Sequence, residues 1–418
     1  MLLIMHPLAQ QATPHRRSAQ GMHPKARMTF TVLVFAMSAL VIAEIALNHR
    51  AQSRGIAEAR RERRRLAQFP SISVIRPVRG ADVGAAENYA AALDTGYPGE
   101  VETIFIFDEA DDAGYPIAEK AIADHQARGG HGTVEILVAG APPHGVTGKL
   151  HAMIVGEEHA QHELVAFGDS DTRPDHEVLR ATVETLLTTP HAGCAFAPVV
   201  ANQPADRAGD VGYATMLNMW YGASVATASR RTGDLPFIMG QLMVFRRECL
   251  RDIGGVACAT GELVDDMAIG RCVAKAGWRN IMAPHPLHIA TGGMSYGEFL
   301  KLSRRWMLFG RNGLPFEFTK PMWLRGIEFW VATAALALAL VTQHWLAALA
   351  PAAALAVFET SLLLINKQFG GAPVRWKHLW VPFALPVIAP VQLGYGLVNK
   401  KVDWRGRAYD LDAHARLA

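Results

Sequence analysis

The sequence predicts a doubly wound α/β domain that lies between membrane-spanning helices. Residues 66–320 alternate short β-rich runs with helical stretches of about ten to fifteen residues, a pattern typical of a parallel sheet. Long apolar runs flank this region, and hydrophobic residues make up 50% of the 418-residue chain against 19% charged residues. A chain of this length has room for about two or three domains.

The overall charge does not indicate a nucleic-acid partner. The chain has 41 Lys and Arg residues against 38 Asp and Glu residues, which gives a net charge of +3. Its four cysteines (Cys194, Cys249, Cys258 and Cys272) show no Cys-x-x-Cys spacing and no paired His pattern. We therefore interpret them as reduced core residues, not as zinc ligands or a disulfide framework.

Residues 28–48 are predicted to form a transmembrane anchor. About twenty mostly apolar residues suffice to cross the hydrocarbon core, and Glu44 is the only charge among these. A cleaved signal peptide is the alternative, but the run is long and lacks a clear cleavage site. Residues 1–27 show no periodicity and are expected to be disordered, and Met28 offers an alternative start of the chain.

The basic residues around this anchor predict its orientation. Seven arginines lie within residues 50–65, whereas residues 16–27 before the anchor hold four basic residues. The positive-inside rule then places the following domain in the cytoplasm. A solvated helix and contact with anionic lipid headgroups both account for the arginine run.

Residues 327–398 are predicted to be membrane segments. Residues 327–342 and 346–365 indicate a helical hairpin, whereas residues 379–398 contain three prolines, which favour a kinked or re-entrant segment. Basic residues flank this last segment on both sides, and three full crossings would leave the basic tail, residues 399–418, outside the cytoplasm. We therefore expect a re-entrant or interfacial segment.

The elements of the α/β region are expected in a regular order. The expected strands are residues 71–75, 101–107, 133–138, a strand that ends at Asp169, and residues 237–245. The expected helices are residues 84–93, 117–127, a stretch that begins at Lys149, residues 211–228 and a helix with Asp265 in its first turn that ends near Lys275. Ligands of such sheets bind beyond the carboxyl ends of the strands.

Acidic residues follow two of these strands. Asp169 and Asp171 come directly after the apolar run 164–168, and Asp108 follows the strand 101–107. Carboxylates are costly to bury alone, so a pair at a strand end favours a cation such as Mg²⁺ or Mn²⁺. An ordinary Asp-Ser-Asp turn is the alternative for Asp169 and Asp171, because short Asp-x-Asp strings are frequent.

Further polar residues are candidates for the same site. Lys149 ends a glycine-rich loop that is not a P-loop, because Leu150 stands where Ser or Thr is required. Lys149 is a candidate diphosphate contact or an ordinary surface lysine. Asp265 and Asp266 open a helix, where acidic residues favour the helix dipole; Asp266 is equally a candidate general base.

Together these motifs resemble those of the membrane-bound family 2/21 glycosyltransferases, most closely the ceramide glucosyltransferases and their bacterial relatives, which include hopanoid glycosyltransferases. The similarity runs from about Ser71 to Trp306. The positions that match the family motifs are Asp108, Asp169 with Asp171, Asp266, and Arg305 with Trp306. Leu302 stands where the family has Gln or Arg, and Arg304 is a candidate substitute. The closing segment 402–409 is similar to the Trp-Arg element of the family.

The resemblance implies a GT-A-like nucleotide-sugar domain that uses a divalent cation, Mg²⁺ or Mn²⁺. Asp171 with Asp169 would hold the cation, and Asp169 and Lys149 would contact the donor. Asp108 would hold the nucleotide base or ribose. The implied donor is a UDP-sugar, and the implied location is a bacterial inner membrane with the catalytic domain in the cytoplasm.

The implied reaction is an inverting transfer of a hexose, with glucose as the expected sugar, to the hydroxyl of a membrane lipid, with ceramide as the expected acceptor. Asp266 would accept the proton of that hydroxyl, and Arg305 and Trp306 would contact the diphosphate and the acceptor. Residues 211–228 would guide the lipid or belong to the core. A hopanoid or diacylglycerol acceptor, a processive polysaccharide synthase and a non-catalytic scaffold are the alternatives.

Overall fold

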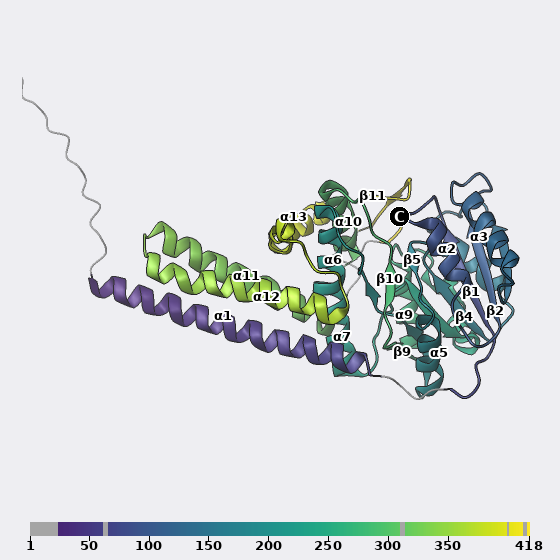
Figure 1. Cartoon of the computed structure of the whole chain (residues 1–418), viewed down its shortest axis with the longest axis horizontal. Coiled ribbons are helices and arrows are strands. Elements are labelled where there is room, and N and C mark those ends of the chain that lie inside the picture. The colour runs from purple at the N-terminus through teal and green to yellow at the C-terminus, as the bar shows by residue number, and fades with distance from the viewer. Residues whose placement is uncertain (1–23, 62–65, 310–313, 399–400, 413–415) are drawn as a thin grey trace, which may run out of the picture.

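The computed structural model consists of a bundle of long helices with an α/β domain at one end (Figure 1). It describes residues 24–61, 66–309, 314–398, 401–412 and 416–418. Most of the N-terminal segment that we predicted to be disordered lies outside these residues. Residues 24–27 are described, however, and they belong to the first helix.

Three helices form the bundle: α1 (Pro24–Ala59), α11 (Phe316–Val341) and α12 (Trp345–Phe369). They run side by side, with α1 packed against both others (Figure 1). Each is long and apolar enough to cross a membrane, as the sequence predicts. A buried ion pair between Arg325 and Glu328, 3.1 Å apart, also binds α1 through Gln52 and Asn48.

The last apolar helix, α13 (Trp380–Val398), lies beside α10 (Tyr296–Phe309) and also contacts α11 and α12 of the bundle (Figure 1). It is one continuous helix in spite of its internal prolines, and it also has the length and composition of a membrane span. The Ser303 hydroxyl donates to the Gln392 side chain at 2.6 Å, so α13 is tied to the α/β domain.

A seven-stranded sheet in the order β3-β2-β1-β4-β8-β6-β9 forms the centre of the α/β domain. Its strands are β1 (Ile72–Val78), β2 (Val101–Phe107), β3 (Thr133–Val138), β4 (Leu164–Gly168), β6 (Ala192–Phe196), β8 (Leu242–Arg246) and β9 (Arg279–Met282). The first four strands pair in parallel at the predicted places. Strand β8 is antiparallel to both of its neighbours, so the sheet is mixed and not wholly parallel.

Helices cover both faces of this sheet, as the sequence predicts for a doubly wound domain. They are α2 (Ala85–Leu93), α3 (Tyr115–Ala127), α4 (Gly148–His159), α5 (Val178–Thr188), α8 (Arg247–Ile253) and α9 (Asp265–Lys275). Alternate residues of β4 point to opposite faces: Leu164 and Ala166 pack in the cluster of α5, and Val165 and Phe167 in the cluster of α4.

Two small sheets complete the architecture. One joins β5 (Thr172–Arg173), β10 (Leu287–Ile289) and β7 (Val199–Val200) beside the end of β4. The other is a hairpin of β11 (Lys401–Trp404) and β12 (Arg407–Asp410), which follows α13 and returns to the α/β domain. The expectation that residues 399–418 are only a basic tail is therefore wrong for this hairpin.

The predicted strand 237–245 is shorter in the structure, where β8 begins at Leu242. The amide of Gly240 donates to the Asp266 carboxylate at 2.8 Å and so is used for a side chain instead of a strand neighbour. The apolar run Phe237–Met239 is buried without strand pairing, which explains why its pattern resembles that of a strand.

The predicted helix 211–228 is divided into α6 (Ala208–Ala214), a π-helix (Thr215–Gly222) and α7 (Ala223–Thr232). Trp220 and Tyr221 are both buried, and α7 packs against α1 and α11. The segment thus packs between the α/β domain and the helical bundle. This agrees with the interpretation that residues 211–228 belong to the core.

Candidate active site

A cavity of about 160 Å³ opens at the carboxyl ends of β1, β2 and β4. All of the predicted site residues line it, namely Asp108, Lys149, Asp169, Asp171, Asp266, Arg305 and Trp306. They come from loops after β2 and β4 and from the starts of α4 and α9, with the last two on α10. The fold therefore brings together side chains that lie up to about two hundred residues apart in the chain.

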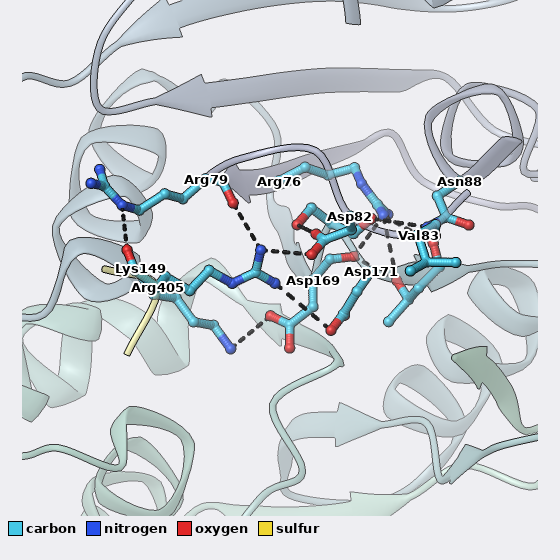
Figure 2. A network of polar contacts seen from close by, with 11 residues as sticks. Arg76, Arg79, Asp82, Val83, Asn88, Lys149, Asp169, Asp171 and Arg405 are labelled. Carbon is cyan, nitrogen blue, oxygen red and sulfur yellow. Dashed lines mark hydrogen bonds and ion pairs between the residues drawn. The ribbon is translucent and has the colours of Figure 1, made fainter. Parts of the chain in front are cut away.

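Lys149 is paired with Asp169 across this cavity. The Lys149 Nζ lies 2.7 Å from Asp169 Oδ1 (Figure 2). Burial alone would lower the pKa of the Lys149 ammonium, but the charges of Asp169, Asp265 and Asp266 together raise it. Lys149 is therefore a fixed positive charge in the cavity and not an ordinary surface lysine.

Asp171 has an unsatisfied oxygen beside this pair. Its Oδ1 is buried and has no hydrogen-bond partner among the described residues. Burial and the charge of Asp169 raise the pKa of Asp171 to about 6. An orphaned carboxylate oxygen next to a second carboxylate suits a hard divalent cation, so these residues fit the predicted metal.

Two carboxylates alone do not complete a metal coordination sphere. In the part of the chain that the structure describes, no group of three or more His, Cys, Asp or Glu residues could hold a metal ion. Mg²⁺ commonly takes one or two carboxylates and completes its octahedron with substrate phosphates and water. Asp169 and Asp171 match this kind of site.

A buried arginine supports the loop that carries both carboxylates. Arg76 of β1 is 2% exposed and donates from Nη2 to the carbonyl oxygens of Asp169, at 2.7 Å, and Thr172, at 3.3 Å (Figure 2). Burial lowers the pKa of Arg76 to about 10, so it remains charged at neutral pH. Arg76 was not among the predicted site residues, because it lies within the apolar strand β1 and belongs to no motif.

Asp108 is buried between two arginines. The Nη1 atoms of Arg79 and Arg407 lie 2.6 Å and 2.7 Å from its Oδ2. Arg79 follows β1, and Arg407 comes from the C-terminal hairpin. The carboxylate that we predicted to bind the nucleotide thus lies between two guanidinium groups at the end of β2.

Asp266 lies at the start of α9 on the opposite side of the cavity. Its Oδ2 accepts from the Gly240 amide at 2.8 Å and its Oδ1 from the Met267 amide at 2.7 Å. Burial and the charge of Asp265 raise the pKa of Asp266 to about 7, although Lys149 acts in the opposite direction. A carboxylate with a pKa near neutrality is suited to accept a proton in a reaction.

Arg305 and Trp306 reach the cavity from α10. The Arg305 guanidinium lies 5.4 Å from the centre of the Trp404 ring, within cation–π range. Trp306 meets the rings of Tyr213 and Tyr221 edge to face, with centres 6.3 Å and 5.2 Å apart. These aromatic contacts fix the wall of the cavity that is nearest to α13 and the bundle.

Arg304 does not take the place of the missing Gln or Arg at position 302. Its guanidinium stacks over the Tyr395 ring of α13 at 3.6 Å, and Arg304 does not line the cavity. Leu302 packs against the hydrophobic core. The expectation that Arg304 substitutes in this motif is therefore wrong, since successive residues of a helix point in different directions.

The sequence analysis also missed part of the lining. Trp404, Arg405, Arg407 and Tyr409 of the C-terminal hairpin all face the cavity. Segment 402–409 resembles a Trp-Arg element of the family, so the sequence did single out these residues. The resemblance did not assign a role to any of them.

Comparison with known proteins identifies the family. Residues 31–417 match the model of glycosyl transferase family 21, and the chain therefore belongs to the family 21 glycosyltransferases. This is the family that the sequence motifs predict, and it agrees with the mixed α/β domain and flanking apolar helices described above.

Individual relatives are distant. Ceramide glucosyltransferase 3 of Caenorhabditis elegans is 22% identical over 243 residues, or 58% of this chain and 50% of that protein. Putative cellulose synthases 2 and 3 of Komagataeibacter xylinus are each 25% identical over 228 residues, or 53% of this chain and 14% of theirs. The chain thus spans about half or less of the length of these curated relatives.

Among solved structures, a mannosyltransferase from Pyrobaculum calidifontis in complex with GDP-Man and Mn²⁺ is similar to this chain with a TM-score of 0.49. The two are 17% identical, and the similarity covers 86% of this chain and 99% of the mannosyltransferase.

Proposed function

We propose that this family 21 glycosyltransferase moves a hexose, glucose, from a UDP-sugar to the hydroxyl group of a membrane lipid, ceramide, with inversion at the anomeric carbon. One observation carries the proposal: the acidic and basic residues of four separate motifs line the same cavity. The cavity wall includes α10, which packs against the apolar helix α13. A lipid hydroxyl and a soluble nucleotide-sugar can meet in such a place.

Asp171 together with Asp169 would hold a divalent cation in this reaction. When bound, the cation supplies positive charge that stabilises the diphosphate leaving group. Lys149, fixed 2.7 Å from Asp169, adds a second positive charge at the same place. Asp108, positioned by Arg79 and Arg407 at the end of β2, would bind the ribose or the base.

Asp266 would accept the proton of the lipid hydroxyl as its oxygen attacks the anomeric carbon. The amides of Gly240 and Met267 fix its carboxylate, and its raised pKa suits a general base near neutral pH. A single displacement of this kind inverts the anomeric configuration, so an α-linked donor gives a β-linked product. Arg305 and Trp306 would contact the diphosphate and the lipid at the membrane side of the cavity.

The catalytic domain would face the cytoplasm of a bacterial inner membrane. The arginines at residues 50, 54, 60 and 61 lie at or beyond the end of the apolar part of α1, next to the α/β domain, which supports this orientation under the positive-inside rule.

The function is tested with membranes that contain the full-length protein. They are incubated with labelled UDP-glucose and, in separate reactions, ceramide, diacylglycerol or a hopanoid, and the products are identified by mass spectrometry. A β-linked glucosylceramide that the Asp266→Asn variant does not form is the expected result. Transfer to another lipid alone would contradict the ceramide assignment, and a long polysaccharide product would contradict the single-transfer reaction.

A further inference from the structure

The C-terminal hairpin forms a wall of the cavity although it follows the last apolar helix of the chain. Val402 and Leu411 are buried against Leu263 and Val264, next to the start of α9. The amide of Leu417 also donates to the Gly261 carbonyl oxygen at 2.9 Å. These contacts fix the hairpin to the α/β domain, so its position over the cavity is part of the fold.

The turn of the hairpin holds an arginine in an unfavourable backbone conformation. Trp404 pairs with Arg407, which leaves the two-residue turn Arg405-Gly406, and both residues have positive φ, 52° and 74°. Two-residue turns of this kind favour Asn followed by Gly, because a larger side chain is strained at positive φ. Arginine at position 405 therefore does not stabilise the backbone of the turn. We infer that its side chain makes contacts that compensate for this strain.

The Arg405 side chain is directed into the cavity beside the acidic pair (Figure 2). Its Nη1 donates to Asp82 Oδ1 at 2.7 Å and to the Arg79 carbonyl oxygen at 2.8 Å. Its Nη2 lies 3.8 Å from Asp171 Oδ2, which is too far for a hydrogen bond. The first contacts orient the guanidinium, and the second nitrogen faces the place where the acidic pair would hold a cation and a phosphate.

Arg407 is the second arginine that the hairpin contributes to the cavity. Its Nη1 lies 2.7 Å from Asp108 Oδ2. The Nε atom of Arg305, on the facing wall, is buried without a hydrogen-bond partner in the described part of the chain. A buried donor that lines a cavity and lacks a partner indicates a ligand with acceptor oxygens.

The charges of the lining support an anionic ligand. Five aspartates line the cavity, and they are matched by five basic residues, of which the hairpin contributes Arg405 and Arg407. Without these two arginines the lining would hold five carboxylates against three basic side chains, a formal charge of −2 that would repel a diphosphate. The hairpin therefore provides the charge that makes the cavity suitable for the donor.

We propose that Arg405 and Arg407 bind the diphosphate of the nucleotide-sugar together with the residues of the catalytic motifs, so that residues 401–410 form a part of the donor site. The planar guanidinium groups match phosphate oxygens in pairs. This inference rests on the proposed function and adds to it the residues that discriminate a nucleoside diphosphate from a nucleoside monophosphate.

The test is a binding titration of the full-length protein in detergent with UDP and UMP, each with Mg²⁺. Arg405→Asn removes the guanidinium but places the preferred residue in the turn, so the hairpin should stay folded. We expect this variant and Arg407→Gln each to weaken UDP binding by roughly tenfold to a hundredfold, the usual effect of losing a charge-assisted contact, and UMP binding by much less. Arg405→Lys keeps the positive charge but lacks the planar guanidinium group. Its affinity for UDP should lie between that of the wild type and that of Arg405→Asn.

Arg416→Gln is the matched control, because Arg416 lies in the same tail but pairs with Glu262 outside the cavity. It should bind UDP as tightly as the wild type. Equal losses of UDP and UMP affinity in Arg405→Asn, or no loss, would overturn the diphosphate role, because an arginine that only neutralises carboxylates does not distinguish the two ligands. Wild-type protein that binds no nucleoside diphosphate would overturn the proposed function itself.

Discussion

The surroundings of individual carboxylates separate their roles in the cavity. Asp108 accepts from Arg79 and forms an ion pair with Arg407 at its buried position, whereas Asp171 has an oxygen without a partner among the described residues. Asp266 is bound by backbone amides, and burial together with the charge of Asp265 raises its pKa. The same side chain is therefore suited to nucleotide binding, to metal binding or to proton transfer, depending on its neighbours.

Asp266→Asn should abolish sugar transfer while UDP binding persists, because an amide keeps the shape of the side chain but cannot accept the proton. A general base contributes about a hundredfold to ten-thousandfold to the rate. Product formation is followed with labelled UDP-glucose, and Asp124→Asn is the control, since Asp124 is exposed and pairs with Lys120 on the surface of α3. Unchanged transfer by Asp266→Asn would remove the base assignment.

The transfer rate should rise with pH through about 7, the pKa of Asp266. Only the deprotonated carboxylate accepts a proton, and a raised pKa means that this form is lost already as the pH falls below neutrality. We expect about a tenfold higher rate at pH 8 than at pH 6 at saturating substrates. A rate that stays level from pH 5 to pH 8 would contradict this role.

Removal of divalent cations with EDTA should abolish transfer, and added Mg²⁺ or Mn²⁺ should restore it. Asp171→Asn should raise the cation concentration for half-maximal activity at least about tenfold, because a neutral amide is a weaker ligand for a hard cation. The measurement is a titration of activity against the metal. Full activity of the wild type in EDTA would exclude the predicted metal.

At the scale of elements, a close approach of two helices joins the membrane bundle to the α/β domain. A Cβ atom added to Gly55 of α1 would lie 2.8 Å from the Thr227 amide nitrogen and 2.9 Å from the Ala226 carbonyl oxygen of α7. Both of these atoms belong to the backbone, so they cannot move aside as a flexible side chain would. Glycine at position 55 therefore allows the two helices to touch.

Gly55→Val should accordingly destabilise the protein by about 1–3 kcal/mol, the usual cost of overpacking. Thermal unfolding in detergent measures the loss. Gly326→Ala is the control, because Gly326 of α11 has nothing within 4 Å of its added Cβ, and alanine favours a helix. An unchanged unfolding temperature of Gly55→Val would show that α1 and α7 do not need this contact.

The bounds of many helices and strands could be predicted from the sequence. Strands β2 and β3 have the predicted bounds, because apolar runs between turn residues leave little choice of register. The start of β8 could not be predicted, since Phe237 and Ile238 are as apolar as strand residues and only the distant Asp266 draws the Gly240 amide out of the sheet.

At the scale of the whole molecule, the hairpin decides how the chain crosses the membrane. If α11 and α12 both cross the membrane, the chain after α12 is again on the side of the membrane where the α/β domain lies. The hairpin after α13 contacts Asp108 and Asp82 of that domain, so it must lie on the same side. A full crossing by α13 would place it on the other side, and we therefore expect α13 to stay in the interface next to α10.

Reporter fusions in a bacterial host test this expectation. Alkaline phosphatase fused after residue 418 should be inactive and green fluorescent protein there should fluoresce, because the proposed orientation places the C-terminus in the cytoplasm. Alkaline phosphatase fused at Gln343, in the turn between α11 and α12, should be active as the control. An active phosphatase after residue 418 would mean that α13 crosses the membrane.

The sequence by itself determined the order of strands and helices, the apolar segments and the family, because these depend on local periodicity and on motifs of neighbouring residues. It also identified the carboxylates that meet in the cavity. Only the tertiary structure decided that Arg405 and Arg407 share that cavity, since about three hundred residues separate them from Asp108 along the chain. The sequence around a charged residue does not show which distant charge it will contact in the folded protein. These contacts between distant charges determine the chemistry of the site.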